Sequence, residues 1–204
     1  MTGQQARRTR MSAEDRRESI LVAATEVFAE VGYLRGKTST VARRVGVSEP
    51  VVFQNFGTKA ALFAAVVERA ADHICRMLDR ATVSTYPVSG LLRVVLDPDH
   101  LRQVHSAGAV GAIFADASSV TDEPEVEAAA RTATQRFAAA LVGLLDRGKA
   151  DGELRADLDT GAAAWWLLSL VASQRFRQAT AADFEAVESR IAESTLAFLL
   201  PVDR

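Results

Sequence analysis

Two short apolar segments separated by a glycine constrain this chain more than any other feature. The first covers about residues 38–45, Gly46 interrupts it, and Ser48 begins a second segment that ends near Phe56. Glycine tolerates the positive φ of a tight turn. Serine is a preferred helix cap, and Pro50 fits the first helical turn. The spacing therefore predicts two short helices joined by a tight turn, which is a helix-turn-helix.

The apolar residues around this turn have the spacing that the motif needs. Ala42 is small where the two helices meet, Gly46 follows four residues later, and Val52 lies six residues further on to fill the space between them. An amphipathic stripe over residues 20–31 predicts a third helix that fixes their angle. A second helix of this kind fits the DNA major groove. The alternative is an ordinary helical hairpin inside a larger bundle.

The rest of the chain is helical by the same criterion. Apolar residues recur at helical spacing, alanine is abundant, and we find no convincing strand pattern. We expect an all-α fold of about nine helices, covering residues 12–32, 38–45, 48–56, 59–81, 91–96, 99–117, 125–149, 160–178 and 181–200.

Charge is distributed unevenly along the chain. Residues 1–58 carry nine basic and six acidic side chains, a net charge of +3, whereas the whole chain has a net charge of −2. A basic end on an acidic body suits a protein that docks on phosphates at one end only. The alternative is a chance asymmetry. We divide the chain into a flexible basic arm (1–11), a helix-turn-helix DNA-binding domain (12–58), and a larger helical domain (59–204).

Catalytic and metal-binding patterns are not apparent. The three histidines and the single cysteine lack ligand spacing, since His73 and Cys75 are two positions apart and point away from each other on a helix. We see no glycine-rich phosphate loop and no nucleophile elbow. The expectation is a protein that is not an enzyme, with no metal site and no cofactor. With no signal peptide and no apolar run of membrane-spanning length, we expect a cytoplasmic location.

About 50 residues from Arg16 onward resemble the DNA-binding domain of the TetR family of transcriptional regulators. The matches are Ile20, Ala23, Ala24, Phe28, Gly32, Tyr33, Val41, Ala42, Gly46, Val47, Ser48, Phe53, Phe56, Lys59, Leu62 and Phe63. The resemblance implies a three-helix bundle followed by a larger, divergent helical domain that binds a small effector and forms a homodimer. It implies a repressor that a small molecule releases from a palindromic, double-stranded DNA operator.

Four positions depart from the family pattern. Gly36-Lys37 replaces a usual Thr/Ser pair, Glu49 replaces a usual basic residue, and Phe53 lacks the hydroxyl of the usual aromatic residue. Glu49 and Phe53 motivate an alternative function, a helical interaction module that does not bind DNA specifically.

The candidate DNA contacts come from the two short helices and their flanks. Gln54 and Asn55 carry amides that can bond an adenine edge, and Val51 can pack on a thymine methyl group. A solvated or core role is the alternative for each. The full set is Lys37, Thr38, Arg43, Arg44, Ser48, Glu49, Pro50, Val51, Phe53, Gln54, Asn55 and Lys59.

The body offers candidates for two further surfaces. A pocket for a small, mostly apolar effector is expected among residues 62–176, lined by His73, Met77, His105, Phe114 and Trp165, with plain core packing as the alternative. The helix around Trp165-Trp166 is apolar on most sides, so it needs burial on most sides. The expected dimer interface comprises Trp166, Leu170, Phe184, Val187, Ile191 and Phe198, with a larger monomeric core as the alternative.

Overall fold

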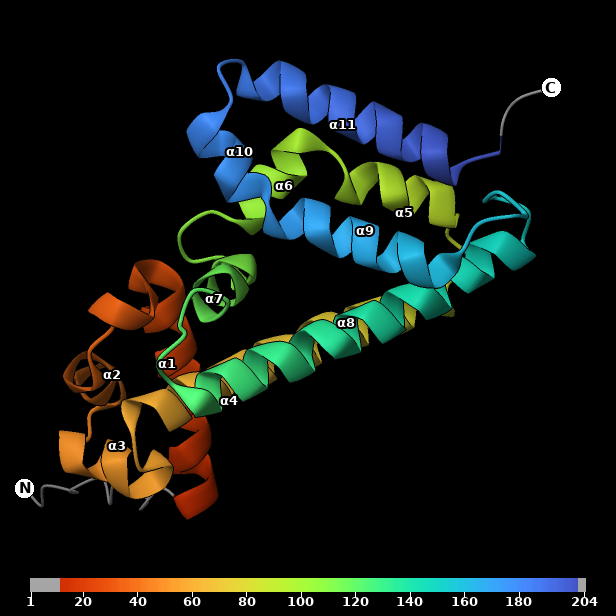
Figure 1. Ribbon diagram of the computed structural model, residues 1–204. Helices are drawn as coiled ribbons and strands as arrows, with labels where there is room; N and C mark the ends of the chain where they lie inside the picture. The colour runs from red at the N-terminus through yellow and green to blue at the C-terminus, as the bar shows by residue number, and fades with distance from the viewer. Residues whose placement is uncertain (1–11, 202–204) are drawn as a thin grey trace, which may run out of the picture.

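Eleven helices form the structure, a computed structural model that describes residues 12–201 (Figure 1). No strand occurs in this described part, so the expected all-α class is confirmed. The helices are α1 (Ala13–Arg35), α2 (Thr38–Val45), α3 (Glu49–Phe56), α4 (Lys59–Thr82), α5 (Val88–Val95), α6 (Pro98–Val104), α7 (Val110–Ala117), α8 (Pro124–Ala150), α9 (Thr160–Ala172), α10 (Gln174–Thr180) and α11 (Phe184–Leu199).

Two of the expected helices are each divided in the structure, which explains eleven helices in place of about nine. The expected helix over 99–117 becomes α6 and α7, because Gly108 adopts a left-handed φ of 87° and its N–H bonds to Ala29 O instead. The expected helix over 160–178 ends at Ser173 and resumes as α10. Helix α1 continues for one turn beyond Gly32, which interrupts it with a φ of 78°.

Capping residues place the helix starts. The Ser12 side chain accepts from the N–H of Asp15 at 3.0 Å, and Thr58 accepts from Ala61 N–H at 2.9 Å. Asp97, Asp159 and Asp183 cap α6, α9 and α11 in the same way. Each cap satisfies an N–H group that has no partner within its helix.

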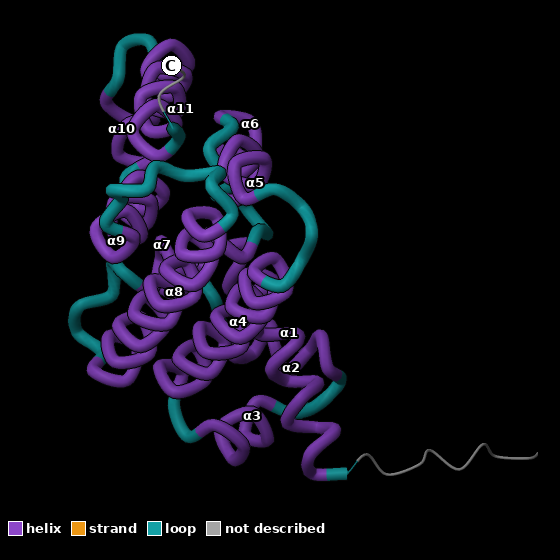
Figure 2. The backbone as a smooth tube through the Cα atoms, turned by 90° about the vertical axis from the view of Figure 1, so that its right-hand side faces the viewer, coloured by secondary structure: helices purple, strands orange, loops and turns teal. Residues whose placement is uncertain are grey.

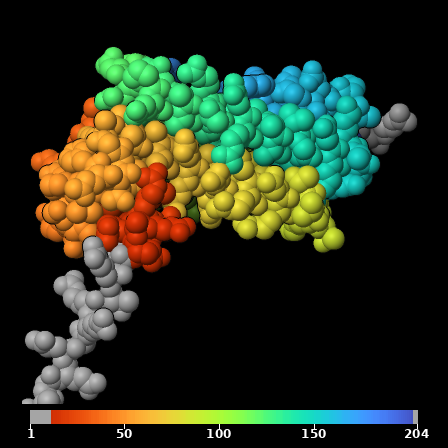
Figure 3. All heavy atoms as spheres, turned by 90° about the horizontal axis from the view of Figure 1, so that it is seen from below, coloured from red at the N-terminus to blue at the C-terminus, as the bar shows by residue number. Residues whose placement is uncertain are grey.

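Helices α4 and α8 form the long axis of the molecule and lie side by side (Figures 1 and 2). Both begin near the three-helix bundle of α1–α3, where the Thr58 hydroxyl lies 3.4 Å from a carboxylate oxygen of Glu125. From below, the two helices run together from the bundle toward the opposite end (Figure 3). Movement of this pair would therefore reach the bundle directly.

The apolar core consists of two clusters. One begins in the helix-turn-helix and continues through α4 into α7 and the first half of α8, with Phe28, Phe63 and Ile113 fully buried. The other joins α5, the end of α8, α9 and α11. Burying one large side chain contributes roughly 1.5–3 kcal/mol, so the first cluster fixes the bundle firmly to the body.

Within residues 12–201, no single helix is long and apolar enough to cross a membrane. Helices α3 and α4 meet the length and composition criteria only when taken together, and they are bent by 67° at their junction.

Candidate nucleic-acid interface and regulatory body

The helix-turn-helix has the core that its sequence predicts. Val41, Ala42 and Val52 are buried between α2 and α3, and Gly46 takes the left-handed conformation at φ 77° and ψ 33°. A Cβ added at Gly46 would meet nothing within 4 Å. Backbone conformation, and not crowding, therefore explains the glycine.

Both ends of α3 are held by side chains from neighbouring helices. At its start, the buried Thr38 hydroxyl donates to the Glu49 carboxylate. At its end, the Arg17 guanidinium donates to Asn55 O at 2.6 Å and lies 4.1 Å from the centre of the Phe56 ring. These contacts fix the direction in which α3 presents its outer face.

Several candidate DNA contacts are engaged within the protein. Arg44 bonds to Glu30 at 2.6 Å and to Glu26 at 3.3 Å. The Asn55 amide donates to Val51 O at 2.7 Å, one turn back along its own helix. Glu49 is occupied by Thr38. These side chains build the bundle in the observed conformation.

Lys59 is also engaged. Its ammonium lies 4.5 Å from the centre of the Tyr33 ring and donates to Leu34 O at 3.3 Å. Burial lowers the pKa of Lys59, against the opposing influence of Asp116 and Glu123. Because Lys59 is the first residue of α4, these contacts with α1 join the bundle to the body.

The remaining candidates face outward. Among the described residues, the exposed side chains of Lys37 and Arg43 have no ion-pair or hydrogen-bond partner. Val51 is half-buried. The outward set comprises Lys37, Arg43, Ser48, Pro50, Phe53 and Gln54. The expected arm over residues 1–11 lies outside the described residues.

Replacing Arg17 by alanine should weaken operator binding about three- to tenfold, because the end of α3 loses its anchor. The Arg17→Lys variant keeps the charge but loses the planar stacking, and we expect it to recover only part of the loss. The measurement is fluorescence anisotropy with labelled operator DNA over a range of salt. An unchanged salt slope is expected for this positioning role. A slope reduced by about one would instead identify a phosphate contact.

Two carboxylates of the body accept hydrogen bonds from Tyr33, next to the kink in α1. Asp116 of α7 accepts from the Tyr33 N–H, which Gly32 frees from the helix, and a Cβ at Gly32 would lie only 3.2 Å from Asp116 Oδ1. Glu123 accepts from the Tyr33 hydroxyl at 2.8 Å. Burial first, and then Glu123, raise the pKa of Tyr33 to about 12. Sequence reasoning missed both carboxylates, since they lie more than 80 residues from Tyr33.

The candidate effector residues differ in their exposure and contacts. His73, Met77 and Trp165 are exposed, Phe114 packs edge-on against Phe137 at 4.9 Å, and His105 Nδ1 lies 2.9 Å from Leu101 O. None of the five lines either described surface hollow.

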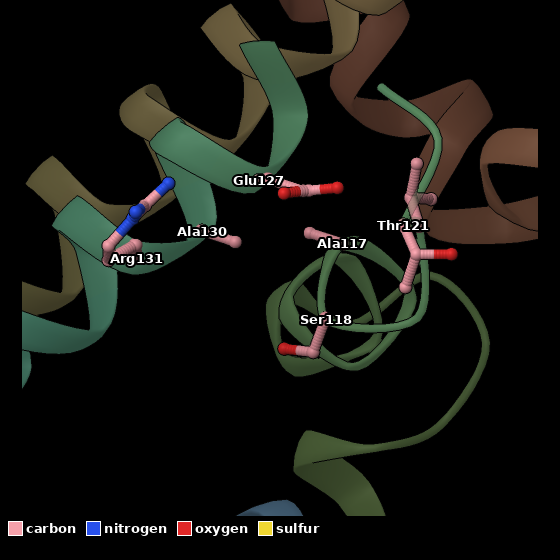
Figure 4. Close-up of a pocket in the computed structure, with 7 residues that line it drawn as sticks. Ala117, Ser118, Thr121, Glu127, Ala130 and Arg131 are labelled. Carbon is pink, nitrogen blue, oxygen red and sulfur yellow. The ribbon is translucent and has the colours of Figure 1, made fainter. Parts of the chain in front are cut away.

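One hollow, of about 290 Å³, lies between α7 with its following loop and α8 (Figure 4). Its lining is mixed, with the polar side chains of Ser118, Thr121, Glu127 and Arg131 beside the apolar Ala117, Val120 and Ala130. The other, of about 350 Å³, lies along α5 and α6 and includes Asp97, Asp99 and His100. Within the described residues, no group of His, Cys, Asp or Glu is arranged to hold a metal ion.

One buried side-chain amide has no hydrogen-bond partner in the structure. Gln174, the first residue of α10, is 1% exposed, and neither of its side-chain polar atoms has a hydrogen-bond partner in the structure. An unsatisfied buried amide costs stability, which makes Gln174 a position of interest for a polar group of an effector. The sequence placed this residue in an expected helix without marking it.

The candidate dimer residues lie on an apolar face of α9 and α11. Trp166 is 52% exposed and Phe198 is 47% exposed, with ring centres 6.5 Å apart. Trp165 and Phe176 are exposed on α9 and α10. The half-buried candidates are Leu170, Phe184, Val187 and Ile191. Neighbouring exposed aromatic side chains such as Trp166 and Phe198 are typical of interaction surfaces.

A buried ion pair near this face joins α10 to α11. Arg177 of α10 donates to both carboxylate oxygens of Glu188 on α11, whose side chain is 2% exposed. Arg177 also donates to Leu170 O at 3.0 Å and to Ser173 Oγ at 2.7 Å. The pair therefore ties α9, α10 and α11 together.

Comparison with known sequences gives one family and several regulators. Residues 20–66 match the model described as bacterial regulatory proteins of the tetR family. The HTH-type transcriptional activator FasR of Mycolicibacterium smegmatis is 30% identical over 145 residues, which are 71% of this chain and 65% of that protein. The HTH-type transcriptional repressor Rv3405c of Mycobacterium tuberculosis is 36% identical over 93 residues, with 36% of this chain and 50% of that protein covered. The chain thus spans between half and two thirds of these relatives' lengths.

Solved structures share the fold over nearly the whole chain. Reduced NemR of E. coli matches with a TM-score of 0.76 at 17% identity and covers 93% of this chain and 100% of its own. FadR of Bacillus subtilis in complex with stearoyl-CoA matches with a TM-score of 0.63 at 17% identity, with 89% of this chain and 98% of its own covered. The helix-turn-helix over residues 20–66 is therefore that of the bacterial regulatory proteins of the tetR family, and the fold of the chain is shared with solved regulators of that family.

Proposed function

We propose that this chain is a dimeric, ligand-responsive transcriptional regulator that places α3 in the major groove of a palindromic operator. One observation carries the proposal: α3 is clamped at both ends by Thr38 and Arg17, and the side chains of Pro50, Phe53 and Gln54 on its outer face are exposed. Lys37 and Arg43 flank that face as exposed charges, suited to phosphates on either side of the groove. The proposed DNA-binding domain is residues 12–58.

Residues 59–204 form the proposed effector-binding and dimerisation domain. The apolar face around Trp166 and Phe198 would bury itself against a second copy, so two α3 helices would read two half-sites. Release of DNA by an effector is the proposed mode of regulation, which makes the protein a repressor. Its proposed location is the cytoplasm.

The effector is proposed to be a small, mostly apolar molecule. Two solved neighbours are described with stearoyl-CoA and with choline, which shows how varied the ligands of this fold are. We propose that a ligand acts by displacing α7, because Asp116 and Glu123 connect that region to Tyr33 in the DNA-binding domain. A ligand shifts the equilibrium only by binding the two conformations with different affinity. No catalytic role is proposed.

Selection from random duplex DNA tests the DNA-binding function. The full chain is incubated with a randomised pool at low salt, and bound DNA is recovered and sequenced over several rounds. We expect an inverted repeat whose half-sites are centred about 10 base pairs, or a multiple of that, apart. Enrichment of no sequence over the starting pool would refute the proposal and favour an interaction module that does not read DNA.

A further inference from the structure

The outer face of the recognition helix α3 carries no charge. Its one ionisable side chain, Glu49, turns inward to the hydroxyl of Thr38, and the amide of Asn55 turns back onto Val51 O. The exposed side chains are Pro50, Phe53 and Gln54. Since these three positions are spaced i, i+3 and i+4, they form one continuous surface on the helix.

Phe53 is the principal apolar group of this surface. Its side chain is 41% exposed, whereas Phe56, one turn later, is 8% exposed and lies under Arg17. Among the described residues, the Phe53 ring has no aromatic or cationic partner. It also lacks a hydroxyl, so it offers a phosphate nothing to bond. The chemistry of this side chain suits an apolar target.

The major groove offers one prominent apolar group. Every base pair presents donors and acceptors there, but only thymine adds a methyl group, at C5. A recognition helix with an apolar ring and a single exposed amide therefore has few hydrogen bonds to make and much to gain from methyl contacts. Gln54, adjacent to the ring, can bond the N6 and N7 edge of adenine.

We propose that Phe53, flanked by Pro50, reads thymine methyl groups in each half-site, and that Gln54 reads a neighbouring adenine. This inference rests on the proposed function, in which α3 enters the major groove. It makes Phe53 a specificity-determining residue and predicts half-sites that contain thymine at the positions facing the ring. Burying one methyl group contributes a factor of roughly four in affinity, and two half-sites multiply this factor.

Deoxyuridine substitution tests the reading of methyl groups, because uracil pairs as thymine does and lacks only the methyl. The full chain is titrated into the selected operator duplex, prepared with thymidine or with deoxyuridine in its half-sites, and anisotropy gives the dissociation constants. We expect the substitution to weaken wild-type binding roughly tenfold. We expect Phe53→Ala to bind the thymidine duplex more weakly and to be indifferent to the substitution.

Gln54→Ala is the matched control on the same surface. It should bind more weakly yet remain sensitive to deoxyuridine, because its loss concerns hydrogen bonds. Equal wild-type affinity for both duplexes, with Phe53→Ala weakening both alike, would place the ring on the sugar–phosphate backbone and overturn the inference alone. If the wild type binds the selected operator no more tightly than a duplex of random sequence, the proposed function is overturned and this inference with it.

Discussion

Replacing Glu188 by alanine is expected to lower the free energy of unfolding by about 3–5 kcal/mol. Its side chain is 2% exposed and receives two hydrogen bonds from Arg177, whose own side chain is 12% exposed. Removing the carboxylate leaves a guanidinium charge buried without its counter-ion, which costs far more than an exposed pair contributes. Urea unfolding at one fixed protein concentration measures the loss, since the stability of a dimer depends on concentration.

Glu185→Ala provides the control on the same helix. The Glu185 side chain is 82% exposed and lies 3.6 Å from Arg102, so its loss should change stability by no more than about 0.5 kcal/mol. Equal losses in the two variants would mean that Arg177 finds other partners and that the buried pair does not hold α10 to α11.

If the proposed dimer forms through α9 and α11, replacing Trp166 by glutamate is expected to convert it to a monomer and to weaken operator binding about 100-fold or more. The side chain is half exposed in the single chain, so the monomer can accommodate the change. In the proposed dimer, the same carboxylate would be buried in an apolar interface without solvation. Losing the dimer removes the gain from reading two half-sites at once. Sedimentation gives the mass, and anisotropy gives the affinity.

Val83→Glu is the matched control for the added charge. Val83 is 84% exposed at the end of α4, outside the apolar face of α9 and α11, and the variant should remain dimeric and bind normally. A Trp166→Glu protein that still sediments as a dimer would show that the subunits meet elsewhere.

Local sequence signals predicted the bundle well because its determinants are close in the chain. Gly46 marks the turn through its left-handed backbone, and Ala42 and Val52 are buried at short range around it. The breaks in the body are different. Gly108 opens the helix expected over 99–117 because its N–H bonds to Ala29, almost 80 residues away, and no local pattern contains that partner.

Side-chain roles at the candidate interface were harder to predict for the same reason. The sequence predicts a phosphate contact for Arg44, but in the structure its guanidinium forms ion pairs with Glu26 and Glu30 on α1. Lys59 is drawn onto the Tyr33 ring. Helical periodicity shows which side of a helix is polar, but it does not show which distant carboxylate or ring lies opposite. The sequence could predict which residues of α3 share an exposed surface. Only the structure shows that these side chains have no hydrogen-bond or ion-pair partner among the described residues.

The most direct test of sequence-specific DNA binding is the affinity of the full chain for DNA flanking its own gene, compared with its affinity for a shuffled duplex of the same composition. Anisotropy titrations at physiological salt give both dissociation constants. We expect a dissociation constant of about 10⁻⁸ M or tighter for the flanking DNA, at least about 10³-fold tighter than for the shuffled duplex. Equal affinities for the two duplexes would contradict a sequence-reading helix-turn-helix.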